Sequence, residues 1–110
     1  MNRDIIVTAW NNGQHHASGA GYGFKVSLKD RDKHFERGWK TVALKLPGVE
    51  HLVHVNIEKH SFWNTSCREL ISLEIGKWLL RASLAPWPKG SPPKLALRAT
   101  RSGEFEVRTS

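Results

Sequence analysis

The chain has 110 residues, and 17 lysines and arginines against 10 acidic residues give it a formal charge of +7 with histidine neutral. The length fits one domain over residues 1–110, and 39% hydrophobic residues with five tryptophans are enough for a packed core. A single cysteine excludes an intramolecular disulfide framework. The lack of a signal-peptide core, or of an apolar run of about 18 residues, predicts a cytoplasmic protein that does not enter a membrane.

The first part of the chain has the residue pattern of two strands and a short helix. Residues 4–10 form a mostly apolar run, and residues 22–28 alternate apolar with polar side chains, as a half-buried strand does. Residues 30–37 are expected to form a short helix, because Asp30 can cap its first turn and Gly38 can end it.

Residues 39–46 and 52–57 are predicted to form an antiparallel hairpin. A four-residue connection would place Leu44 opposite Val53, and the neighbouring apolar pairs would follow in the same register. Both apolar rows then lie on one face, as a sheet with one buried face requires.

A long amphipathic helix is predicted over about residues 65–83. Ser66 and Glu69 have the spacing of a capping box, in which each side chain reaches the other residue's backbone N–H. The apolar residues of this segment fall on one helical stripe, which consists of Cys67, Ile71, Ile75, Trp78, Leu79 and Ala82. We therefore expect this helix to lie across the sheet.

The end of the chain has the pattern of a second hairpin. A three-residue loop over 102–104 would pair Ala99 with Val107 and keep both apolar rows on one face, with Gly103 in a left-handed or bulged position. The predicted order along the chain is ββαββαββ. This order indicates an α+β fold with a mainly antiparallel sheet, one long helix and one short helix.

Residues 11–23 are rich in glycine and resemble in composition a loop that binds phosphate. Their glycines alternate and lead into a predicted strand, however, whereas dinucleotide-binding glycines lead into a helix. The segment is therefore interpreted mainly as a connection between strands, in which small residues are needed for the backbone conformation. Its length also fits a functional loop.

The candidates for catalysis are three histidines and the cysteine: His15, His16, His60 and Cys67. Cys67 near a helix N-terminus would have its thiolate favoured, and His60 could act as its base. The histidine spacings do not match those of zinc ligands, so no metal site and no cofactor are predicted.

The charge points most directly to nucleic acid or another polyanion as the partner, because lysine and arginine attract phosphate. Basic side chains that alternate with apolar rows would form an outward sheet face, and tryptophans near strand or loop ends would add stacking surfaces. The predicted binding residues are Lys25, Lys40, Lys45, Arg98, Arg108, Trp39 and Trp87.

Two other functions remain open at this point. The chain could be a protein-interaction or self-associating module that uses Trp39, Trp63 or Trp87 as anchors. It could also be a small enzyme built on the glycine-rich loop, in which case its histidines should converge in one pocket. The leading prediction is a non-enzymatic binding protein.

Overall fold

The computed structural model describes residues 4–64 and 68–109. Its strands are β1 (Asp4–Asn11), β2 (Tyr22–Lys25), β3 (Thr41–Lys45), β4 (Val53–Asn56), β5 (Glu69–Ile71), β6 (Lys94–Arg101) and β7 (Glu104–Thr109). Its helices are α1 (Leu28–His34), α2 (His60–Trp63) and α3 (Leu73–Arg81). Among these described residues, no helix is long and apolar enough to cross a membrane.

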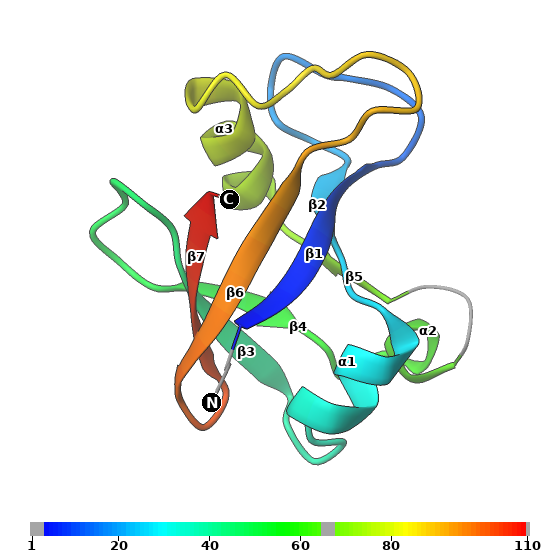
Figure 1. Ribbon diagram of the computed structural model, residues 1–110, viewed down its shortest axis with the longest axis vertical. Helices are drawn as coiled ribbons and strands as arrows, with labels where there is room; N and C mark the ends of the chain where they lie inside the picture. Colours follow the sequence, from blue (N-terminus) through cyan, green and yellow to red (C-terminus); the bar gives the residue numbers. More distant parts are fainter. Residues whose placement is uncertain (1–3, 65–67, 110) are drawn as a thin grey trace.

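All seven strands belong to one sheet with the order β4-β3-β7-β6-β1-β2-β5. Neighbouring strands are antiparallel, with the exception of β3 and β7, which run parallel. The sheet curls like a barrel, so that β4 and β5, at the two ends of this order, come into contact. In Figure 1, α3 lies near the upper end of this curled sheet, and α1 and α2 lie at its lower end.

The apolar rows of the strands point into the curl and form the core. The side chains of this interior that are fully buried include Tyr22, Phe24, Leu44, Leu46, Phe62, Leu70, Ile75, Leu79 and Phe105. The predicted mixture of helices with a mainly antiparallel sheet is confirmed. The chain order differs from ββαββαββ, because α2 and β5 are inserted between β4 and α3.

The predicted helix over 65–83 is wrong in its first part. Glu69 to Ile71 form strand β5, and α3 begins only after Ser72, whose hydroxyl accepts a hydrogen bond from the Glu74 N–H. The apolar residues here fit either structure by their spacing, and pairing decides between them: Leu70 is fully buried opposite Phe24 in the sheet. The expected cap residue Ser66 and Cys67 lie outside the described residues.

The short helix also begins and ends earlier than predicted. Ser27, and not Asp30, is its N-cap, and Phe35 ends it in an extended conformation before Gly38 is reached. The reason for the early end lies in the core, where the Phe35 ring stacks on Phe105 at 5.2 Å. A helix continued through this position would carry the ring away from that contact.

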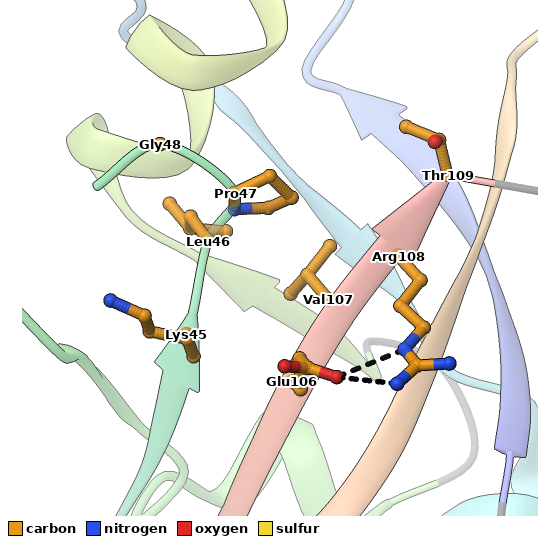
Figure 2. A pocket seen from close by; sticks show the side chains of 8 residues that line it. All are labelled: Lys45, Leu46, Pro47, Gly48, Glu106, Val107, Arg108 and Thr109. Carbon is orange, nitrogen blue, oxygen red and sulfur yellow. Dashed lines mark hydrogen bonds and ion pairs between the residues drawn. The ribbon is translucent and has the colours of Figure 1, made fainter. Parts of the chain in front are cut away.

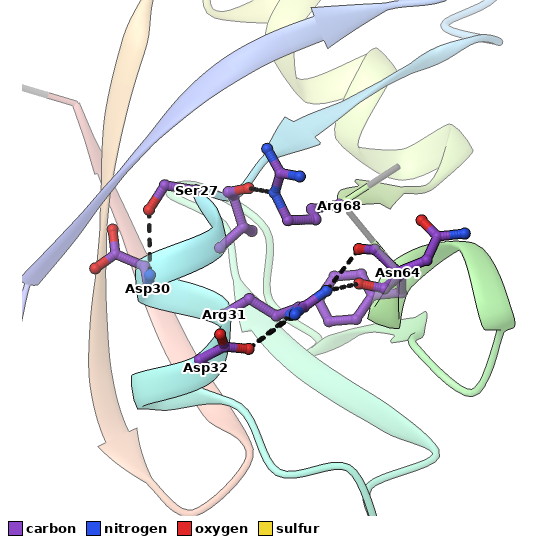
Figure 3. Close-up of polar contacts among 8 residues, drawn as sticks. Ser27, Asp30, Arg31, Asp32, Asn64 and Arg68 are labelled. Carbon is purple, nitrogen blue, oxygen red and sulfur yellow. Dashed lines mark hydrogen bonds and ion pairs between the residues drawn. The ribbon is translucent and has the colours of Figure 1, made fainter. Parts of the chain in front are cut away.

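Helix α1 is joined to α2 by a buried arginine. The Arg31 guanidinium donates to the carbonyl oxygens of Phe62 at 3.0 Å and Asn64 at 2.7 Å (Figure 3). It also pairs with the exposed carboxylate of Asp32 at 2.8 Å and lies 5.5 Å from the ring centre of Trp63.

The two predicted hairpins have different outcomes. In the first, Leu44 lies opposite Val53 as predicted. In the second, Val107 lies opposite Leu97 rather than Ala99, because the turn has two residues and a bulge between Ala99 and Arg101 restores the common apolar face. The expected left-handed conformation of Gly103 is confirmed, with φ of +76°.

Candidate functional site

Three aromatic rings meet at the upper end of the molecule, where residues 12–21 and 82–93 lie near each other (Figure 1). His15 and Trp87 make an edge contact with ring centres 4.8 Å apart, and Trp87 makes another with Tyr22 at 5.7 Å. The His15 Nδ1 atom is 2.7 Å from the Tyr22 hydroxyl. The structure therefore brings together a candidate catalytic histidine and a candidate binding tryptophan.

A groove of about 560 Å³ opens beside these rings, and we call it the Trp87 groove. Its lining comes from β1, the following loop and the segment that precedes β6: Ala9, Trp10, Asn11, Gly13, His15, Trp87, Lys89, Gly90 and Pro92. Two tryptophans, a histidine and a lysine thus line one concave surface. Trp10 and Trp87 are each half-buried, which leaves part of each ring open to solvent.

Strand β1 connects this groove to the outward face of the sheet. Ile5, Val7 and Ala9 are buried, so Thr8 and Trp10 face outward by alternation. Lys25 pairs directly with Thr8 in the sheet register and is exposed. The positive charge of Lys25 on β2 therefore lies beside Thr8, two residues before Trp10 on β1.

The loop that carries His15 is shaped by its own side chains and by its glycines. The Asn11 carboxamide accepts a hydrogen bond from the Gly13 N–H at 2.8 Å and donates one to the Gln14 carbonyl at 2.7 Å. Gly19, with φ of +93°, has no room for a Cβ because the backbone of Lys77 lies against it. These contacts agree with the interpretation of the glycines as backbone requirements.

Tyr22 forms the floor of the aromatic cluster. Its side chain is fully buried, and desolvation raises the pKa of its phenol above 10.0. The phenol is therefore neutral under ordinary conditions and keeps its O–H.

The candidate catalytic residues do not converge. His15 lines the Trp87 groove, His16 is exposed in the same loop, and His60 lines a separate hollow of about 270 Å³ with Arg37 and Trp63. Within residues 4–64 and 68–109, no group of three histidine, cysteine or acidic side chains is placed to hold a metal ion. Cys67 lies outside these ranges.

The predicted basic face is interleaved with acidic residues. Lys45 and Arg108 line one hollow with Glu106, and Figure 2 shows Lys45 extending away from the Glu106–Arg108 ion pair, whose atoms are 2.9 Å apart. In the sheet register, Glu106 lies between Lys45 and Arg98, and Arg98 pairs with Asp4 at 2.9 Å. The charges of this row alternate in sign, so it offers little net field to a polyanion.

Lys40 and Trp39 lie at the other end of the molecule from the Trp87 groove. Lys40 is exposed just before β3, and its carbonyl accepts from the Ile57 N–H. Trp39 lines a hollow of about 470 Å³ between α1 and the β6–β7 turn, together with Lys33, His34 and Arg101 among others. The predicted binding residues are thus distributed over at least two sites.

Trp10 and Lys89 were not among the predicted binding residues, although both line the groove. The outward parity of Trp10 on its strand could have indicated one of them. The position of Lys89 depends on how residues 82–93 fold back over β1, which no spacing in the sequence specifies. Comparison with known proteins found no matching family model, no similar curated protein and no similar solved structure.

Proposed function

We propose that this protein binds single-stranded nucleic acid without catalysing a reaction, and that the Trp87 groove takes an unpaired base. The observation that supports this most directly is that Trp10, His15, Trp87 and Lys89 line one groove. We also propose that it acts in the cytoplasm, as its single cysteine suggests.

The chemistry of the groove fits a base with its attached phosphates. Indole rings stack with any base, and each such contact contributes about 1–3 kcal/mol. Two lysines can approach the backbone phosphates that flank this base. Lys89, in the groove, can approach the phosphate on one side, and Lys25, beside Thr8, the phosphate on the other. A paired base keeps both faces stacked within its duplex, so a duplex would not fill the groove.

Fluorescence anisotropy with labelled oligonucleotides tests this proposal. We expect a single strand of thymidines to bind more tightly than a duplex of the same length, with an affinity that falls as salt increases. Equal binding of the two forms would contradict the role of the groove, and no binding at low salt would end the proposal.

Matched tryptophan variants assign the binding to the groove. Trp87→Leu should weaken single-strand binding about tenfold, because it removes a stacking surface but keeps an apolar side chain. Trp39→Leu makes the same change at the distant hollow and should leave affinity unchanged. Unfolding midpoints measured on both variants separate a loss of binding from a loss of structure. Equal effects of the two variants would exclude the Trp87 groove as the binding site.

The Trp39 hollow favours a second candidate function, which is the binding of an acidic protein segment. Trp39 there supplies an aromatic anchor, and Lys33 and Arg101 supply positive charge around it, beside one acidic residue, Glu36. A peptide of alternating glutamate and leucine should bind the native protein and lose affinity for Trp39→Leu. Binding of this peptide that is unaffected by Trp39→Leu would reject this second function.

A further inference from the structure

The hydrogen bond between His15 and Tyr22 carries information about which ring nitrogen of His15 holds the proton. We infer that Tyr22 donates to His15 Nδ1, so that His15 presents an Nε2–H donor to the Trp87 groove and reads hydrogen-bond acceptor atoms on an unpaired base. The tautomer is a property of the free protein, whereas the recognition of a base rests on the proposed function.

The burial of Tyr22 gives the bond its direction. In the described part of the chain, the hydrogen-bond partner of its phenol oxygen is His15 Nδ1, at 2.7 Å. The Tyr22 side chain has no exposed surface, so water is not at hand to accept from its O–H. If Nδ1 carried a proton, Nδ1 would become the donor and the buried O–H would have no acceptor. A buried polar group without a partner is disfavoured, and the phenol therefore donates.

The proton of the neutral imidazole must then be on Nε2, because the ring carries one N–H and Nδ1 is the acceptor. Nε2 is on the other side of the ring from the buried phenol, and His15 itself is exposed and lines the groove. His15 thus presents an N–H donor to the groove, beside Trp10 and Trp87. Carbonyl oxygens and acceptor nitrogens on the edge of a base fit such a donor.

In this arrangement Tyr22 is a positioning residue, since it would act on the ligand only through His15. Edge contacts from Trp87 to both rings hold the pair in place, at 4.8 Å to His15 and 5.7 Å to Tyr22. A residue with a purely structural role would not control where the imidazole proton resides.

The tautomer can be measured on the free protein by long-range proton–nitrogen correlation NMR of the histidine rings. We expect the neutral form of the His15 ring to show a protonated Nε2 and an unprotonated Nδ1. In Tyr22→Phe, which removes the donor, we expect a mixture of the two tautomers. A protonated Nδ1 in the native protein, or an unchanged spectrum in Tyr22→Phe, would overturn the inference.

Two substitutions of His15 distinguish the roles of its two ring nitrogens. His15→Gln places an amide nitrogen near the position of Nε2, whereas His15→Asn places its amide near Nδ1 and leaves no donor in the groove. The probe is an eight-nucleotide strand with one thymine among abasic units, compared with the same strand carrying 2,4-difluorotoluene, which has the shape of thymine but very weak acceptors.

The native protein and His15→Gln should bind the thymine strand about fivefold more tightly than the difluorotoluene strand, and His15→Asn should bind both equally. Equal binding of both strands by the native protein would overturn the recognition of acceptors. Failure to bind either strand would instead reject the proposed function, while the NMR measurement would still decide the tautomer.

Discussion

Gly76 in helix α3 packs so closely against Gly19 that a methyl group on Gly76 would overlap the Gly19 carbonyl oxygen. Backbone thus meets backbone where the loop of residues 12–21 crosses the helix. This contact fixes the part of the loop that follows His15, and it explains why two glycines far apart in the sequence are both needed.

The stability of Gly76→Ala tests this contact. In an exposed helix this change would stabilise the protein by about 1 kcal/mol, because alanine favours helix. Here we expect the free energy of unfolding to fall by about 1–3 kcal/mol, since the added methyl must displace the loop. Denaturant unfolding measures the change. Gly38→Ala is the control, because nothing lies within 4 Å of the added group. A Gly76→Ala protein as stable as the native one would show that the loop can move away at little cost.

Arg31 should stabilise the fold through its carbonyl partners rather than through its ion pair. Arg31→Met keeps much of the side chain's bulk but removes the hydrogen bonds that Arg31 donates to the carbonyls of Phe62 and Asn64. We expect the free energy of unfolding to fall by about 2–3 kcal/mol. Asp32 is 61% exposed, so Asp32→Asn should cost less than about 1 kcal/mol. The opposite ranking in chemical denaturation would mean that the ion pair dominates.

Tyr22 should make stability decrease at alkaline pH. Burial raises the pKa of its phenol in the folded state above 10.0, so the folded protein holds the phenol proton more tightly than the unfolded chain does. This contribution is complete below pH 10.0 and is lost as the pH rises through the folded pKa. Tyr22→Phe should therefore lose less stability than the native protein between about pH 8 and about pH 11.

The same titration can be followed directly, because Tyr22 is the single tyrosine of the chain. Phenolate absorbance in the ultraviolet should rise only above the pH at which free tyrosine ionises. Ionisation at the pH of free tyrosine would show that the phenol is accessible to water.

Lys89 should contribute to nucleic-acid binding through a phosphate. The slope of log affinity against log salt concentration should decrease by about 0.7 in Lys89→Ala, as expected for one lost phosphate contact on a single strand. Lys40→Ala removes the same charge near the opposite end of the molecule and should leave the slope unchanged. Equal slopes for both variants would indicate a diffuse attraction to net charge.

The residue pattern predicts the register of one local pairing, the β3–β4 hairpin, but not that of the β6–β7 hairpin. The β3–β4 register follows from an apolar period of two and a short connection, and Leu44 indeed faces Val53. The structure of the segment from Glu69 to Arg81 does not follow from its pattern alone. Its apolar residues fit a helical period along the whole segment, yet Glu69 to Ile71 form a strand that pairs with β2. Only the presence of a neighbouring strand decides between the two structures.

The candidate site could be predicted only as separate residues. His15 and Trp87 were each identified as candidates from their own surroundings, but their contact depends on how two loops fold over the end of the sheet. Trp10 and Lys89 line the same groove as His15 and Trp87 because of this folding of the loops. The charge of +7 likewise does not predict where a polyanion would bind, since Arg98 and Arg108 of the sheet are paired with neighbouring carboxylates.

The parallel pairing of β3 with β7 has a consequence for how the chain folds. Strand β7 follows β6 along the chain, yet it lies between β3 and β6 in the sheet. The β3–β4 hairpin is therefore joined to the rest of the sheet by a strand about 60 residues away in the sequence. Contacts between segments so far apart form slowly, so we expect this junction to form late in folding.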